Sequence, residues 1–135
     1  MDAIVIDASV AVKWYLEEAG SGAAREILAS KDRLVAPSFI FLEVQYVLSI
    51  AARKGRFDPA AIERAETTLL RRFDMLTPVE QLMIAAAKLS RSFDHPIYDC
   101  LYIELALAEG TRLATADARQ AEMARQAGAK TLRVG

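Results

Sequence analysis

The sequence predicts one α/β domain in which helices cover both faces of a central parallel sheet of four to five strands. Short apolar runs rich in β-branched residues alternate along the chain with longer helical patterns. Such alternation is typical of parallel strands joined by helical crossovers. The length of 135 residues fits a single domain with its own core. We therefore expect residues 1–135 to form one domain.

Five segments are expected to form the strands. The first, at residues 3–6, reads A-I-V-I and is apolar throughout, as is typical of a strand buried on both faces of a sheet. R-L-V-A at residues 33–36 and R-L-A-T at residues 112–115 are similar in length. A short candidate lies at residues 74–76, and a last strand is expected at residues 131–134. We expect the first strand to lie in the middle of the sheet.

Helical patterns fill the intervals between these strands. A short helix is expected at residues 9–18, where the Ser9 hydroxyl can cap the first turn. The longest pattern, at residues 39–54, has Ser38 as its expected N-cap and Gly55 directly after its last turn. Asp58-Pro59 is a typical helix start. The other expected helices occupy residues 23–30, 59–72, 79–93, 96–109 and 118–127.

Composition and charge exclude several kinds of site. The chain has one cysteine, Cys100, and one histidine, His95, which excludes an internal disulfide, a cysteine cluster and a multi-histidine metal site. His95 is expected to pack or cap ahead of Pro96 rather than to act as a base. The net charge is −1, and no apolar run reaches the ~18 residues that a membrane span needs. We expect a soluble, cytoplasmic protein with no membrane partner.

Four acidic residues occupy places where a charge is unusual. Asp7 follows the first strand, and Asp117 follows the strand at residues 112–115. Glu43 lies within the apolar long helix, and Asp99 lies in the first turn of the helix after Pro96. Each has a structural explanation, since Glu43 can sit on a narrow solvent stripe, Asp99 can favour the helix dipole, and Asp117 can cap a helix. Burial of an unpartnered carboxylate is costly, however.

The joint pattern of the four acids indicates a metal site. Ligands bind at the carboxyl ends of strands in open α/β sheets, and all four positions can meet there. Carboxylates so close together repel one another, and a hard divalent cation relieves that repulsion. A set of oxygen ligands without histidine or cysteine points to Mg²⁺ or Mn²⁺ rather than Zn²⁺. Such an ion can activate a water molecule for attack on a phosphodiester.

Four motifs carry a resemblance to a known family. These are I-V-I-D-A-S-V, S-F-I-F-L-E-V, H-P-I-Y-D-C-L-Y-I-E-L-A and L-A-T-A-D. Together they resemble the PIN-domain ribonucleases, and the length of the chain is most similar to the VapC toxins of bacterial VapBC toxin–antitoxin pairs. The resemblance runs from Ile4 to about Val134. It implies a PIN-like nuclease domain and a Mg²⁺- or Mn²⁺-dependent endoribonuclease that hydrolyses RNA with a metal-activated water.

The resemblance also assigns roles to residues and implies partners. The acidic quartet of the family falls on four residues, with Asp7 and Asp99 as principal metal ligands and Glu43 and Asp117 completing the site or binding through water. Two hydroxyl residues, Ser9 and Thr115, have supporting roles. The family implies a homodimer, a hetero-oligomer with a cognate antitoxin, and contact with promoter DNA only through that antitoxin.

Candidate surfaces for these partners can be named from the residues. The aromatic residues of the long helix pattern, Phe39, Phe41 and Tyr46, can serve the core or a contact with a second copy or the antitoxin. Basic side chains that can contact RNA phosphates, or lie free in solvent, are Lys13, Arg53, Lys54, Arg56, Arg91 and Arg119.

Two other functions stay open at this stage. One is phosphotransfer or phosphatase chemistry, although a dehalogenase-like site requires D-x-D after the first strand and Ser9 stands at the second position. The other is a non-catalytic binding protein whose acids are structural. The sequence does not specify which RNA is cleaved, the number of metal ions or the identity of the antitoxin.

Overall fold

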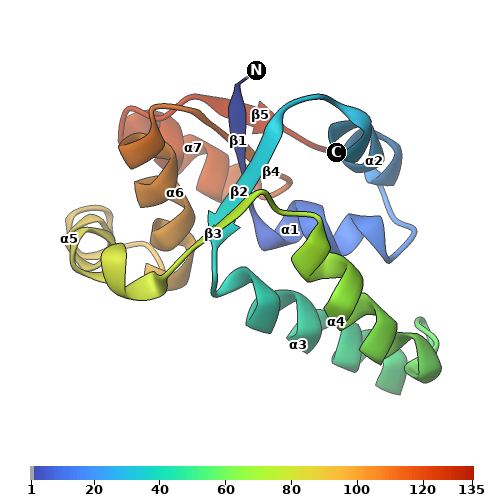
Figure 1. The fold of residues 1–135 in the computed structure, drawn as a ribbon. Coiled ribbons are helices and arrows are strands. Elements are labelled where there is room, and N and C mark those ends of the chain that lie inside the picture. The colour runs from blue at the N-terminus through green and yellow to red at the C-terminus, as the bar shows by residue number, and fades with distance from the viewer. Residues whose placement is uncertain (1) are drawn as a thin grey trace.

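The computed structural model describes residues 2–135 and contains one five-stranded parallel sheet with strand order β3-β2-β1-β4-β5. Helices cover both faces, with α5, α6 and α7 on the left of the sheet in Figure 1 and α1 and α2 on the right, while α3 and α4 extend below the sheet to the lower right. The predicted fold class is therefore confirmed. The strands are β1 (Ala3–Ile6), β2 (Arg33–Pro37), β3 (Met75–Thr77), β4 (Arg112–Thr115) and β5 (Thr131–Arg133).

The helices match the predicted intervals, with short 3₁₀ turns added to several of them. The first helix, α1, continues into a 3₁₀ turn, and 3₁₀ turns also precede α4 and α5. The α-helices are α1 (Ala8–Ala11), α2 (Ser21–Ala29), α3 (Ile40–Arg53), α4 (Ile62–Arg71), α5 (Met83–Phe93), α6 (Ile97–Glu109) and α7 (Ala118–Gln126). The 3₁₀ turns are Val12–Trp14, Pro59–Ala61 and Val79–Gln81.

Strand β1 lies in the middle of the sheet, as predicted, and its neighbours fix the position of the residue that follows it. Ile4 pairs with Leu34 of β2 on one side and with Arg112 of β4 on the other. Val5 and Ile6 are fully buried. The N–H of Asp7 continues the pairing by donating to the carbonyl of Ala114 at 3.0 Å. The backbone of Asp7 is therefore held at the carboxyl end of the sheet.

The first helix differs from the prediction in its cap and in its length. Asp7, not Ser9, is the N-cap of α1, because its carboxylate accepts the N–H of Ser9. The helical turns stop at Trp14 rather than residue 18. In the segment that follows, Lys13 Nζ donates to the carbonyl of Ala19 at 2.6 Å. These contacts hold residues 15–20 in a turn that leads to α2.

The start of α3 also differs from the prediction. Ser38 was expected to be the N-cap, but its N–H donates to the carbonyl of Thr77 at 2.8 Å and so extends the contact between β2 and β3. The N-cap position belongs to Phe39, without a capping side chain. The two other predicted signals are confirmed: Gly55 adopts φ +73° after α3, and Asp58 caps the turn that begins with Pro59.

Within the described residues 2–135, no helix is long and apolar enough to cross a membrane.

Candidate metal centre

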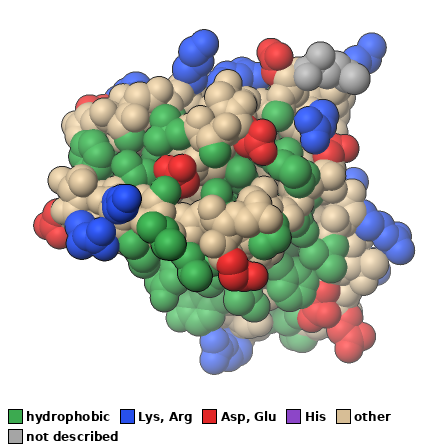
Figure 2. All heavy atoms as spheres, turned by 60° about the vertical axis from the view of Figure 1, so that its left-hand side comes forward, with side chains coloured by type: hydrophobic (Ala, Val, Ile, Leu, Met, Phe, Trp, Pro, Cys, Tyr) green, Lys and Arg blue, Asp and Glu red, His purple; other side chains and the backbone are tan. Residues whose placement is uncertain are grey.

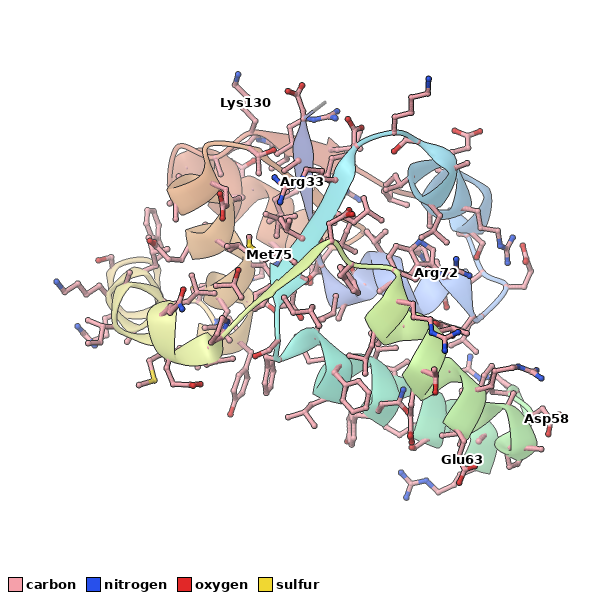
Figure 3. All side chains as sticks on the ribbon, viewed as in Figure 1. Arg33, Asp58, Glu63, Arg72, Met75 and Lys130 are labelled. Carbon is pink, nitrogen blue, oxygen red and sulfur yellow. The ribbon has the colours of Figure 1, made fainter. Side chains whose placement is uncertain are left out.

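The four acids singled out in the sequence line one pocket at the carboxyl end of the sheet. The pocket has a volume of about 270 Å³ and is also lined by Ser9, Tyr46 and Gln120, among other residues. Asp7 reaches it from the end of β1, Glu43 from α3, Asp99 from α6 and Asp117 from the start of α7. Figure 3 shows that acids elsewhere, such as Glu63 on α4, point away from this end of the sheet.

Asp7 is buried, with 5 % of its surface exposed. Its Oδ2 accepts hydrogen bonds from the hydroxyls of Ser9 at 2.5 Å and Thr115 at 3.1 Å. The Ser9 hydroxyl in turn accepts the N–H of Ala116 at 2.9 Å, which explains why this hydroxyl does not cap α1. The two hydroxyl residues predicted to support the site therefore both contact Asp7.

Glu43 does not lie on a free solvent stripe of α3. Its Oε1 accepts a hydrogen bond of 2.5 Å from the phenol of Tyr102, which projects from α6 and is fully buried. The side chain of Glu43 is only partly exposed, in the pocket. The hydrogen bond from Tyr102 on α6 therefore helps to hold this carboxylate of α3 at the pocket.

Asp99 lies one helical turn after the single histidine of the chain. His95 is 3 % exposed, and its Nε2 lies 3.1 Å from Oδ2 of Asp99. The expectation that His95 packs in the core is thus correct, and it also contacts an acid of the pocket. The Asp99 carboxylate therefore has a buried imidazole beside it, while its side chain keeps 27 % of its surface exposed.

Asp117 is the N-cap of α7, because its Oδ1 accepts the N–H groups of Arg119 at 2.9 Å and Gln120 at 3.1 Å. The structural explanation offered for this acid is therefore correct, and Asp7 likewise caps α1. Capping does not explain Glu43 or Asp99, neither of which is an N-cap. Both lie in the first turns of their helices, where the helix dipole favours a carboxylate, as the structural explanation of Asp99 expects.

Burial and mutual repulsion raise the pKa values of three of these acids. Asp7 has a pKa of about 6. Burial is the main cause of the rise and the charge of Asp99 adds to it, while the hydrogen bond from Ser9 lowers the pKa. Burial raises the pKa of Glu43 to about 7, with added contributions from the charges of Asp7 and Asp99. The pKa of Asp99 is also raised, mainly by burial. The nearby His95 lowers this pKa, and the charge of Asp117 raises it. The acids are therefore electrostatically linked.

The donor set of the pocket fits Mg²⁺ or Mn²⁺ in its chemistry. All four groups are carboxylates, and a divalent cation would relieve the repulsion that contributes to the raised pKa values of Asp7, Glu43 and Asp99. Among residues 2–135, no group of three or more histidine, cysteine, aspartate and glutamate side chains is placed so that it could hold a metal ion as the side chains stand. The fit is therefore one of ligand chemistry and shared pocket, in which one or two carboxylates and water can hold Mg²⁺.

Three residues of the site were not assigned to it from the sequence: Tyr46, Tyr102 and Gln120. Tyr102 and Gln120 are buried, whereas Tyr46 is 66 % exposed at the pocket. The polar pattern of α7 gives no sign that Gln120 points inward. One expected RNA contact is wrong, since Lys13 is 8 % exposed and its Nζ binds Glu18 at 3.0 Å.

The fold is shared with solved structures of low sequence identity. PAE2754 from Pyrobaculum aerophilum matches 96 % of this chain and 83 % of its own, with a TM-score of 0.70 and 22 % identity. VapBC2 from Rickettsia felis, crystallised with a DNA fragment from its promoter, matches 98 % of this chain and 99 % of its own, with a TM-score of 0.69 and 14 % identity. A domain of a protein from Methanocaldococcus jannaschii matches 100 % of this chain and 92 % of its own, with a TM-score of 0.56 and 16 % identity.

No curated protein matches the sequence significantly. The model of one family, the PIN domain, matches residues 4–126, a span that includes all four acids and every strand except β5. The chain belongs to the PIN-domain family.

Proposed function

We propose that the protein is a Mg²⁺- or Mn²⁺-dependent endoribonuclease and the toxin of a toxin–antitoxin pair. The observation that carries this proposal is the pocket in which Asp7, Glu43, Asp99 and Asp117 meet from four separate elements. Helix capping and the helix dipole do not require four carboxylates to share one pocket where burial and repulsion oppose the ionisation of Asp7 and Glu43. Membership of the PIN-domain family supports a nuclease.

Each acid has a role that follows from its surroundings. Asp7 and Asp99 would hold the ion directly, because they come from adjacent elements and sense each other's charge. Glu43 and Asp117 would act through bound water. The chemistry that the cation supplies when bound is activation of water and neutralisation of charge on the phosphodiester. Ser9 and Thr115 hold Oδ2 of Asp7, which leaves its other oxygen available to the ion.

We also propose that two copies pair through an apolar surface beside the pocket, and that an antitoxin binds the protein in the cell. The surface consists of exposed side chains of α3, α5 and α6, namely Leu42, Tyr46, Met83, Ile84, Ile97 and Tyr98. Figure 2 shows hydrophobic side chains gathered over the lower part of the face that α5 and α6 form. Large exposed apolar patches are uncommon on monomers. The shared fold of VapBC2 supports the antitoxin.

Cleavage of RNA by the purified chain tests the proposed activity. We expect cleavage of total RNA in Mg²⁺ or Mn²⁺, none in EDTA, and none by Asp7→Asn or Asp99→Asn, each with a circular dichroism spectrum like that of wild type. Glu63→Gln, which changes an exposed acid of α4, is the matched control and should cleave normally. Full cleavage in EDTA, or full activity of Asp99→Asn, would contradict the proposal.

A further inference from the structure

Gln120 is a buried amide inside the acid pocket. It lies on α7, three residues after Asp117, and only 1 % of its surface is exposed. A glutamine in the polar helix A-R-Q-A-E-M-A-R-Q would ordinarily face water. Burial of an amide is costly unless both of its ends are hydrogen-bonded. The contacts of Gln120 therefore need an explanation.

Both ends of the amide are bonded, and each bond leads to an acid of the site. Nε2 of Gln120 donates to the main-chain carbonyl of Asp99 at 3.2 Å. Oε1 accepts from the hydroxyl of Thr115 at 3.0 Å. The orientation of the amide is fixed, because a carbonyl can only accept and so must face the NH₂ group. The same Thr115 hydroxyl lies 3.1 Å from Oδ2 of Asp7.

Thr115 joins this amide to two further acids. Its Oγ1 accepts the N–H of Asp117 at 3.1 Å, so the backbone of the fourth acid is attached to the same hydroxyl. The hydroxyl has one hydrogen, which it gives to either Gln120 or Asp7 at a given moment. Thr115 Oγ1 thus lies within hydrogen-bond distance of both Asp7 and Gln120 and donates to one of them at a time, while Gln120 donates to the backbone of Asp99 and the N–H of Asp117 donates to Thr115.

We propose that Gln120 is a positioning residue that sets the spacing between Asp7, Asp99 and Asp117 for a divalent cation. The three acids come from β1, α6 and α7, and Gln120 links α7 to the first turn of α6. This inference rests on the proposed function. Loss of a partner that orients metal ligands typically reduces metal affinity or activity by 10–100-fold.

The test compares two substitutions of glutamine on one helix. Gln120→Met keeps the length of the side chain and removes both hydrogen bonds. Gln126→Met makes the same change on the exposed face of α7, where the amide contacts only Glu122 among the described residues. Mn²⁺ affinity is measured from the electron paramagnetic resonance signal of the free ion. RNA cleavage gives kcat and KM, and melting in EDTA gives the stability of the metal-free fold.

We expect the affinity of Gln120→Met for Mn²⁺ to be lower than that of wild type by a factor of about ten or more. Its kcat should fall while its KM for RNA stays unchanged. Gln126→Met should behave as wild type. Wild-type Mn²⁺ affinity in Gln120→Met, with only a lower melting temperature, would overturn the inference and leave the proposed function intact. No Mn²⁺ binding by the wild-type chain would overturn both. If Gln120→Met does not fold, Gln120→Asn, whose amide is too short to bridge both partners, provides the same comparison.

Discussion

The phenol of Tyr102 on α6 donates a hydrogen bond of 2.5 Å to Oε1 of Glu43 on α3, although the two residues lie far apart in the sequence. The bond opposes the burial that raises the pKa of Glu43 to about 7. Tyr102 is itself fully buried, so its rotamer is fixed by the core. The core therefore determines both where Glu43 points and how readily it ionises.

Substitution Tyr102→Phe is expected to raise the pKa of Glu43 further, because it removes the donor that favours the carboxylate. Ionised Glu43 would then require a higher pH, and the acid limb of the pH profile of RNA cleavage should move upward. Stability should change by only about 1 kcal/mol, the usual worth of one hydrogen bond. Tyr98→Phe, a change at an exposed tyrosine of the same helix, should leave the profile in place.

The metal-free protein is expected to be more stable at pH 5 than at pH 8. Asp7 and Glu43 have pKa values of about 6 and about 7 in the folded state, above their ordinary values of 3.8 and 4.5. Between the unfolded and folded pKa values, the folded state therefore binds more protons than the unfolded state. The stability that these two groups contribute is fully present below about pH 4 and is lost as the pH rises through 6 and 7. For Asp7 the loss amounts to at most about 3 kcal/mol.

Thermal melts in EDTA between pH 4.5 and 8 measure this effect. Asp7→Asn should make the melting temperature depend less strongly on pH, because one of the two groups that titrate is gone and Glu43 remains. Mg²⁺ should restore stability above pH 7 in the wild type by offsetting the charge of the carboxylates. A melting temperature that rises steadily through this interval in EDTA would contradict the assigned pKa directions.

Asp117 serves both as a cap and as an acid of the pocket, and two substitutions separate these roles. Asp117→Asn keeps an oxygen that can accept the N–H groups of Arg119 and Gln120, so the fold should keep its stability while RNA cleavage falls. Asp117→Ala removes the cap as well and should cost about 1 kcal/mol in addition. Urea unfolding and cleavage rates, measured on both variants, test the distinction. Equal activity of wild type and Asp117→Asn would restrict Asp117 to capping.

The apolar surface beside the pocket is expected to carry the contact between two copies. Ile84 on α5 is 71 % exposed, so Ile84→Arg should leave the fold intact and convert the dimer to a monomer. Light scattering during size-exclusion chromatography measures the mass. Leu70→Arg, at a 48 % exposed leucine of α4 outside this surface, is the control and should remain dimeric. A wild-type protein that is monomeric at micromolar concentration would contradict the assignment.

Most elements could be predicted because their signals are local. The β-branched run of β1, the alternation of strands with helices, and the signals at Gly55 and Asp58 all depend on nearby residues. The caps at Ser9 and Ser38 were predicted wrongly for a shared reason. In both cases a contact with a distant segment changes the helix start: the Ser9 hydroxyl accepts the N–H of Ala116, and the N–H of Ser38 donates to the carbonyl of Thr77, next to the pairing of β2 with β3.

The parallel α/β fold and the four acids can be predicted from local sequence, because strand ends and apolar surroundings mark Asp7, Glu43, Asp99 and Asp117 along the chain. The neutral groups that hold those acids are visible only once the helices are packed. Tyr102 and Gln120 face inward because of how α6 and α7 pack against other elements, and neither helix shows this in its own pattern. Orientation of a polar side chain in a core depends on contacts between distant segments, which local sequence does not encode.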